Sequence, residues 1–275
     1  MKFGLLGHPL GHSMSPYIHS ELLKLNGVDG VYNLYDISPD DLSAKKEVLF
    51  DLNGFNVTIP YKKEIIKYID CLDDTASRYN SVNVVKTGGK KVGYNTDVVG
   101  FLKSIQSMGA SLDGKVLMLG GGGVARMMGA ETVIAGGDLT IAVRNPDSDK
   151  TKNLVAMLKN IDGNAKVQVV DIKNISGKFD LLLNATSVGM HPNVDQSPVQ
   201  EEVVSNCKYV FDAIYNPKDT LLAKYAYKNN VTCVTGMEML VRQAAAAQTI
   251  WLDVDFKEED IKQLIDKANL HMENK

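Results

Sequence analysis

Residues 116–126 read Val-Leu-Met-Leu-Gly-Gly-Gly-Gly-Val-Ala-Arg, a short apolar run that leads directly into four glycines. The apolar residues are typical of a buried strand, and a helical pattern follows the glycines. Gly120, Gly122 and Ala125 satisfy the spacing G-x-G-x-x-A. Glycine at such a turn lets the backbone bend tightly and approach a pyrophosphate, which then lies at the amino end of the helix. The stretch therefore predicts a dinucleotide-binding turn, with a glycine-rich turn that binds nothing as the alternative.

The alternation of strand and helix continues to about residue 236. Helices are expected at 124–134 and 151–158, between strand-like runs of apolar residues. Six strands with helices between most of them match a doubly wound parallel sheet of the Rossmann type. The six strand-like runs are 115–119, 139–143, 166–170, 180–184, 209–213 and 231–234.

The first hundred residues also alternate strand and helix, which predicts a second α/β unit. A helix is expected from Ser15, whose hydroxyl would cap it, with Pro16 at the first helical position. Two strand-like runs, at residues 82–85 and 91–94, flank Thr87-Gly88-Gly89, as in a β-hairpin. Two helices after residue 236 lie outside the six-strand count and are expected to return to the first unit. We therefore expect one domain from residues 1–100 and 237–275, and a nucleotide-binding domain from residues 101–236.

Composition and charge exclude several other classes of protein. Of the 275 residues, 44% are hydrophobic and 23% are charged, as in globular proteins. The net charge of −3 gives no electrostatic reason to expect nucleic acid or an anionic membrane as partner. Three scattered cysteines, Cys71, Cys207 and Cys233, and five histidines without ligand spacing predict no disulfide framework and no metal site. The chain shows no signal-peptide core and no apolar run of membrane length, so a cytoplasmic location is expected.

Polar residues follow the apolar runs in two short segments. Residues 54–62 read Gly-Phe-Asn-Val-Thr-Ile-Pro-Tyr-Lys, and residues 93–97 read Gly-Tyr-Asn-Thr-Asp. A lysine and a carboxylate placed ahead of a dinucleotide-type turn indicate proton transfer coupled to hydride transfer. The simpler interpretations are that Lys62 is a solvated lysine and that Asp97 is a first-turn acid that complements a helix dipole.

Several segments in a fixed order together resemble the shikimate dehydrogenase family across essentially the whole chain. The longest is the N-terminal signature at residues 7–19, followed by the G-x-N-V-T-x-P-x-K segment at residues 54–62. The shorter matching segments are Val82-Asn83, Asn95-Thr96-Asp97, Asn184 to Met190 and Gln243-Ala244.

The resemblance implies an activity and a set of site residues. The activity is the reversible reduction of 3-dehydroshikimate, a small molecule, to shikimate by NADPH. Lys62 and Asp97 are implied as the catalytic pair. The implied substrate-binding residues are Ser13, Ser15, Thr58, Asn83, Tyr215 and Gln243. The implied cofactor-binding residues are Gly120, Gly121, Gly122, Gly123, Val124, Ala125, Arg144, Thr186, Ala213 and Gly236.

The end of the second strand of the nucleotide-binding unit bears on the choice of cofactor. Arg144 at that position favours NADP over NAD, because a guanidinium can form paired hydrogen bonds to a 2′-phosphate. Asp147 and Asp149 add negative charge nearby and weaken this preference. The family often has a basic residue where this chain has Ser148, which weakens the phosphate site further.

Other interpretations remain open from the sequence. One is a quinate/shikimate dehydrogenase of broader specificity that uses NAD, and another is a non-catalytic ligand-sensing protein that kept the fold. Ser15 could act only as a helix cap, and Gln243 could face solvent on its alanine-rich helix. His8, His12 and His19 are expected to be structural or surface residues and not ligands. The sequence does not distinguish a monomer from a homodimer.

Overall fold

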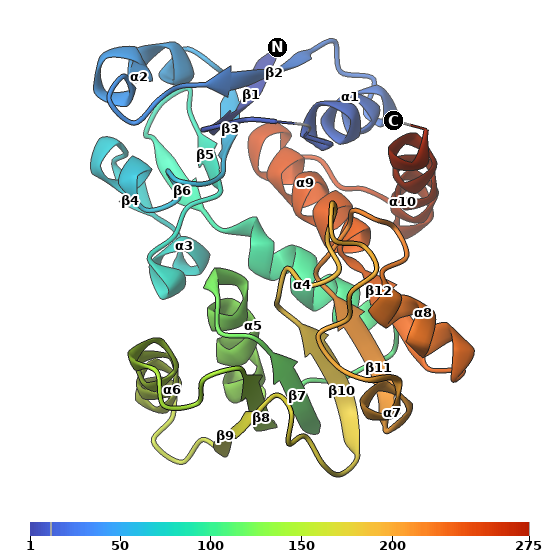
Figure 1. The fold of residues 1–275 in the computed structure, drawn as a ribbon. Coiled ribbons are helices and arrows are strands. Elements are labelled where there is room, and N and C mark those ends of the chain that lie inside the picture. Colours follow the sequence, from blue (N-terminus) through green and yellow to red (C-terminus); the bar gives the residue numbers. More distant parts are fainter. Residues whose placement is uncertain (12, 275) are drawn as a thin grey trace. The chain divides into compact units, whose positions relative to one another are not determined.

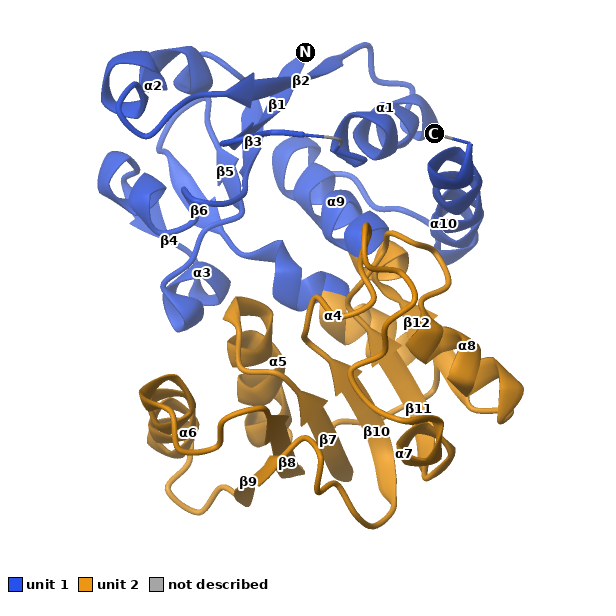
Figure 2. Cartoon of the chain, viewed as in Figure 1, with its two compact units in different colours: residues 1–100, 240–275 blue, residues 101–239 orange. Residues whose placement is uncertain are grey.

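The computed structural model describes residues 1–11 and 13–274, so the expectation for His12 lies outside the described residues. The chain forms two compact units (Figure 2). Unit 1 comprises residues 1–100 and 240–275, and unit 2 comprises residues 101–239. Each unit contains its own six-stranded sheet with helices, so the predicted α/β class is confirmed.

The sheet of unit 2 is entirely parallel, with strand order β12-β11-β10-β7-β8-β9 (Figure 1). Two series of strands therefore run outward from the central pair β7 and β10, which is the predicted doubly wound arrangement. All six predicted strands are present. Their bounds are β7 Lys115–Leu119, β8 Asp138–Val143, β9 Val167–Asp171, β10 Phe179–Asn184, β11 Cys207–Asp212 and β12 Thr232–Thr235.

Helices cover both faces of this sheet because successive strand residues point to opposite sides. Leu117 and Leu119 belong to an apolar cluster that includes Leu222 of α8. Met118, between them, instead lies against Gly129 of α5. The helices that lie wholly in this unit are α5 Gly123–Ile134, α6 Asp149–Ile161, α7 Glu201–Ser205 and α8 Leu221–Lys228.

The sheet of unit 1 is mixed, with strand order β2-β1-β3-β5-β6-β4. β1 pairs in parallel with β2 and β3, whereas β5 runs antiparallel to both β3 and β6. The β5–β6 pair is the predicted hairpin. The strands are β1 Lys2–Gly7, β2 Val31–Asp36, β3 Gly54–Val57, β4 Cys71–Leu72, β5 Val84–Lys86 and β6 Val92–Tyr94.

Helix α1 begins at Ser15, but the prediction that the Ser15 hydroxyl caps it is wrong. Met14 occupies the cap position, and no side-chain cap hydrogen bond forms there. The Ser15 side chain lies near the Tyr32 hydroxyl, which itself donates to Asn56 Oδ1 at 2.7 Å. The other helices with residues in unit 1 are α2 Leu42–Phe50, the 3₁₀ helix η1 Glu64–Tyr68, α3 Asp74–Tyr79, α4 Thr96–Ser107, α9 Gly236–Leu252 and α10 Glu258–Glu273.

Aromatic rings stacked on one face of the unit 1 sheet surround a buried histidine. His19 of α1 is 2% exposed and stacks on Tyr32 with ring centroids 4.2 Å apart. Trp251 of α9 lies 5.4 Å from His19 and stacks on Phe3 of β1. Burial lowers the pKa of His19 from 6.5 to about 3, because the charged imidazolium would lose its hydration. His19 is therefore a neutral core residue, as expected for a structural histidine.

The low pKa of His19 predicts acid-dependent stability. Below pH 6.5 the unfolded chain binds a proton at His19, whereas the folded chain takes up this proton only near pH 3. The contribution of neutral His19 to the free energy of unfolding is therefore complete above pH 6.5 and decreases as the pH falls. We expect about 1.4 kcal/mol of lost unfolding free energy per pH unit in that interval, or about 2 kcal/mol between pH 6.5 and 5.

Urea denaturation of the wild type and of His19→Phe at both pH values tests this expectation. Phenylalanine keeps a stacking ring without a titrating group, so the variant should lose about 2 kcal/mol less than the wild type over the same interval. His191→Gln, at an exposed histidine, serves as control and should follow the wild type. Parallel pH profiles for all three proteins would contradict the assignment.

Candidate active site

The predicted catalytic and substrate-binding segments of unit 1 meet at one edge of its sheet. β1 and β3 are parallel, with Leu6 opposite Val57, so both strands end at the same edge. β5 begins at that edge and β6 ends there, because Val84 pairs with both Asn56 and Tyr94 in antiparallel register. The segments that follow β1, β3 and β6, and the one that precedes β5, are therefore neighbours. These segments carry Ser13, Ser15, Thr58, Lys62, Asn83 and Asp97.

Lys62 and Asp97 form an ion pair at this edge. The Lys62 Nζ donates to Asp97 Oδ2 at 2.6 Å, and the two side chains are 29% and 20% exposed. The Lys62 backbone is held by the Val82 N–H, which donates to the Lys62 carbonyl at 2.7 Å. The Asp97 N–H donates to Asn95 Oδ1 at 3.1 Å. Lys62 is thus partly buried and paired, unlike its exposed neighbour Lys63, so the solvated-lysine interpretation is wrong.

Asn83 joins this ion pair to the rest of the edge. Its side chain is buried, at 3% exposed. The Asn83 Nδ2 lies 2.8 Å from Asp97 Oδ1, 3.2 Å from Gln243 Oε1 and 3.1 Å from Thr96 Oγ1. Gln243 of α9 therefore faces the polar cluster and not only solvent. Direct hydrogen bonds connect four predicted residues, namely Lys62, Asp97, Asn83 and Gln243.

The predicted hydroxyl-bearing residues lie at the same edge and are half-buried. The Ser15 N–H donates to Ser13 Oγ at 3.2 Å, which orders the loop before α1. The Thr58 N–H donates to the Leu6 carbonyl at 2.8 Å and continues the β1–β3 pairing by one residue. These contacts place three hydroxyls beside the strand ends, where a polyhydroxylated ligand could be bound.

Thr96 is a residue of this site to which the sequence analysis gave no role. It is 1% exposed, and its backbone N–H donates to Asn83 Oδ1 at 2.7 Å. This bond fixes the Asn83 carboxamide oxygen toward Thr96, so the Nδ2 hydrogens are directed at Asp97 and Gln243. The only signal in the sequence was the position of Thr96 inside Asn95-Thr96-Asp97.

The glycine turn of unit 2 has the conformation that a phosphate-binding turn requires. Gly120 has φ +99°, and a Cβ atom there would lie 2.8 Å from Thr186 Cγ2. Gly122 occupies the cap position of α5, which begins at Gly123. A Cβ atom at Gly122 or Gly123 would meet nothing within 4 Å. The amino end of α5 is therefore open to a pyrophosphate, and its residues fit the expected dinucleotide.

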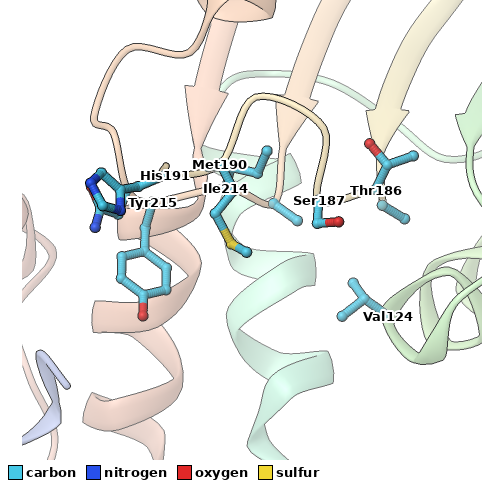
Figure 3. A pocket seen from close by; sticks show the side chains of 10 residues that line it. Val124, Thr186, Ser187, Met190, His191, Ile214 and Tyr215 are labelled. Atoms are coloured by element: carbon cyan, nitrogen blue, oxygen red, sulfur yellow. The ribbon is translucent and has the colours of Figure 1, made fainter. Parts of the chain in front are cut away.

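A pocket of about 350 Å³ lies beside this turn in unit 2 (Figure 3). The predicted residues that line it are Val124, Thr186, Ala213 and Tyr215. Figure 3 shows Thr186 and Ser187 on one side of the pocket and Tyr215 with His191 on the other. Burial raises the pKa of Tyr215, so its hydroxyl stays protonated and can donate a hydrogen bond. The lining residues that the sequence analysis did not assign are Ala185, Ser187, Met190, His191, Ile214 and Asn216.

Gly236, another predicted cofactor residue, is needed for close packing at this pocket. Its N–H donates to the Ile214 carbonyl at 2.9 Å. A Cβ atom at Gly236 would lie 2.2 Å from the Ala213 carbonyl oxygen, which is shorter than any real contact. Glycine there allows the start of α9 to lie directly against the pocket-lining backbone of residues 213–214.

Arg144 follows β8 and its side chain is exposed. Ser148, four residues later, caps α6: its hydroxyl accepts a hydrogen bond from the Thr151 N–H at 3.3 Å. Ser148 thus has a structural role as a helix cap. Arg144 remains the cation that the sequence predicts at the 2′-phosphate position.

Across residues 1–11 and 13–274, no helix has both the length and the apolar character needed to cross a membrane. In the same part of the chain, no three His, Cys, Asp or Glu side chains are grouped so that they could hold a metal ion.

Comparison with known proteins identifies similar chains. Residues 5–85 match the family model described as shikimate dehydrogenase substrate binding domain. A shikimate dehydrogenase (NADP(+)) from Caldanaerobacter subterraneus subsp. tengcongensis is 38% identical over 270 residues, which cover 94% of this chain and 96% of the relative.

Solved structures agree with this match. A chorismate mutase/shikimate 5-dehydrogenase fusion protein from Clostridium acetobutylicum has a TM-score of 0.87 at 33% identity, covering 99% of this chain and 98% of the other. Shikimate 5-dehydrogenase from Thermus thermophilus, in complex with NADP(H) and shikimate, has a TM-score of 0.83 at 28% identity, covering 98% and 99%.

The conformation of Gly120 leads to a prediction for stability. Gly120→Ala should lower the free energy of unfolding by about 1–3 kcal/mol, because the positive φ and the contact with Thr186 both oppose a Cβ atom. Gly163→Ala is the matched control, since a Cβ atom there meets nothing within 4 Å, and its effect should stay within about 0.5 kcal/mol. Urea denaturation measures both, and equal effects of the two substitutions would show that the turn is not constrained as described.

Proposed function

The chain belongs to the shikimate dehydrogenase family, and from this we propose that it catalyses the reversible NADP-dependent reduction of 3-dehydroshikimate to shikimate. The observation that carries the proposal within the molecule is the ion pair between Lys62 and Asp97, 2.6 Å apart at the edge of the unit 1 sheet. A partly buried ammonium held by a carboxylate suits proton transfer to and from an alcohol oxygen.

Lys62 would stabilise and protonate the reacting oxygen. When bound, NADPH supplies the hydride that reduces the ketone carbon. Negative charge then develops on the ketone oxygen, and the Lys62 ammonium can both stabilise this charge and donate the proton that completes the alcohol. In the direction of oxidation, the neutral amine accepts the same proton. The 29% exposure of the Lys62 side chain leaves a route for exchange of that proton with solvent.

Asp97 and its neighbours would orient Lys62 and the substrate. Asp97 Oδ2 accepts from Lys62, while Asp97 Oδ1 accepts from Asn83. With both oxygens engaged, the carboxylate has a defined plane and holds the ammonium in one position. The side chain of Gln243 supplies a further hydrogen-bonding group for a polyhydroxylated acid. The hydroxyls of Ser13, Ser15 and Thr58, beside the strand ends, supply three more. A site of this kind discriminates against analogues that lack a hydroxyl, because its polar groups would then be left unpaired.

Unit 2 would bind the cofactor. The open amino end of α5 can receive the pyrophosphate, and the adjacent pocket, lined by Thr186 and Tyr215, can receive another part of the dinucleotide. Arg144 would contact the 2′-phosphate of NADP. We accordingly assign substrate binding and catalysis to the domain of residues 1–100 and 237–275, and cofactor binding to residues 101–236. We also propose a cytoplasmic location, which the free thiols of Cys71, Cys207 and Cys233 support.

Absorbance of the reduced nicotinamide tests the function directly. The purified protein should reduce NADP in the presence of shikimate and should do so more efficiently than with NAD. Quinate in place of shikimate should give little turnover. Comparable turnover with quinate and NAD would favour a quinate/shikimate dehydrogenase, and no turnover with any pair would favour a ligand-sensing protein.

Substitution of Lys62 tests its role in proton transfer. Lys62→Ala should lower kcat by about 10²–10⁴, the usual effect of losing a general acid, while KM for shikimate changes little. Lys63→Ala is the matched control, because Lys63 is the adjacent but exposed lysine. A Lys62→Ala enzyme with the kcat of the wild type would remove Lys62 from the mechanism.

A further inference from the structure

A carboxylate lies fully buried at the carboxyl end of β11. Asp212 has no exposed surface, and removal of a carboxylate from water is costly unless hydrogen-bond donors replace the lost hydration. Three donors do so. Asn184 Nδ2 and the Ile214 N–H donate to Asp212 Oδ1 at 2.8 and 3.1 Å, and Thr220 Oγ1 donates to Oδ2 at 2.6 Å.

One of these donors extends the network to the loop after β10. Asn184 is also fully buried, and both Nδ2 and Oδ1 of its side-chain amide form hydrogen bonds. While Asn184 Nδ2 binds Asp212, Asn184 Oδ1 accepts from the Thr186 N–H at 3.0 Å and from Thr186 Oγ1 at 2.8 Å. The position of Thr186 is therefore coupled to Asp212 through one buried amide.

The other donors belong to the loop after β11 and to the start of α8. Ile214 lies in the pocket wall, next to Ala213 and Tyr215. Thr220 caps α8, since its hydroxyl also accepts from the Ala223 N–H at 3.1 Å. Figure 3 shows that Thr186 and Tyr215, from the two loops, lie on different sides of the pocket. Hydrogen bonds thus connect both walls of the pocket, through Asn184 on one side and Ile214 on the other, to the carboxylate of Asp212.

Burial raises the pKa of Asp212, and the hydrogen bonds from Thr220, Ile214 and Asn184 act in the opposite direction. Buried polar networks whose members are all hydrogen-bonded make the surrounding structure more rigid. The network therefore indicates a function in holding the two loops at a fixed separation.

We propose that Asp212 is a positioning residue for cofactor binding, which sets the width of the unit 2 pocket through Asn184 on one wall and Ile214 on the other. The inference rests on the proposed function in one respect, namely that this pocket receives part of NADP(H). Neither Asp212 nor Thr220 lines the pocket, so each acts through the residues that do.

Variants of Thr220 test the proposal without removing the carboxylate. Thr220→Val removes the donor to Asp212 Oδ2, and loss of one charge-assisted hydrogen bond should raise KM for NADP and the dissociation constant of NADPH about tenfold. KM for shikimate should change less than the two cofactor constants, because five of the six predicted substrate-binding residues lie in unit 1 and Tyr215 alone of that set lines this pocket. Thr220→Ser retains the hydroxyl and should restore both cofactor constants to nearly the wild-type values.

Asp212→Asn provides a second variant of similar shape, in which an NH₂ group replaces one acceptor oxygen, and the same selective effect on the cofactor is expected. Asp180→Asn is its matched control: Asp180 lies near the opposite end of β10 and accepts from the Lys115 N–H and from Lys208. A purely structural role would lower the melting temperature of the Thr220 and Asp212 variants without changing the cofactor constants, and this result would overturn the proposal.

NADPH binding, measured by nicotinamide fluorescence, separates this proposal from the proposed function. If the wild type binds NADPH but does not oxidise shikimate, the activity is wrong while the effect of Thr220→Val on binding still decides the role of Asp212. If the wild type oxidises shikimate and Thr220→Val binds NADPH as tightly as Thr220→Ser, the role of Asp212 is wrong while the activity stands.

Discussion

The side chain of Asn83 has to satisfy Thr96, Asp97 and Gln243 at once, and the arrangement of the unit 1 site depends on this requirement. The Thr96 N–H donates to the Asn83 carboxamide oxygen at 2.7 Å. Only the Asn83 Nδ2 group is then left to donate to Asp97 and Gln243. Asp97 Oδ1 is then bound to Asn83, and Asp97 Oδ2 is left for Lys62. Because Asn83 is buried, an incorrect orientation of its amide would leave several polar atoms unpaired. The ion pair therefore has one favoured geometry.

Hydrogen bonds also hold the backbone of Asn83 in place. Its N–H donates to the Tyr94 carbonyl, and its carbonyl accepts from the Val57 N–H, so residue 83 is bonded to the segments on both sides of it. Asn56 Nδ2 also donates to the Asn83 carbonyl, and the Tyr32 hydroxyl donates to Asn56 Oδ1 at 2.7 Å. Unit 2 contains a comparable arrangement, in which the Asn184 amide is bonded on both sides. In each unit a buried asparagine beside a strand end orients side chains that are partly exposed.

The features that could be predicted from the sequence are those encoded by local patterns. Strands β7, β8 and β10 of unit 2 are buried on both faces, so each forms a largely apolar run that is bounded by turn residues. The G-x-G-x-x-A spacing likewise indicated a tight turn, and glycine allows the positive φ that Gly120 has there. The two-residue strand β4 and the short helix α3 were not predicted, since neither is long enough to show a period.

Features that depend on contacts distant in the sequence could not be predicted in the same way. The bond of Thr96 to Asn83 spans 13 residues, and that of Asn83 to Gln243 spans 160. Ser15 was expected to cap α1 because serine before proline is a common start of a helix, but in the fold Met14 occupies the cap position and the Ser15 side chain lies near Tyr32. The local Ser-Pro pattern thus predicted where α1 begins but not which contacts the Ser15 side chain makes.

At position 148 two local requirements compete, one for a helix cap and one for the proposed preference for NADP. Ser148 is engaged as the cap of α6, where a lysine or arginine would lack the short hydroxyl that binds the Thr151 N–H. The chain thereby stabilises the helix that follows β8 at the cost of a second cation near Arg144. A phosphate held by a single guanidinium still receives paired, charge-assisted hydrogen bonds, whereas a ribose hydroxyl at the same place offers Arg144 no negative charge. The NADP preference that we propose therefore depends on Arg144, with Asp147 and Asp149 opposing it from the same loop and the first turn of α6.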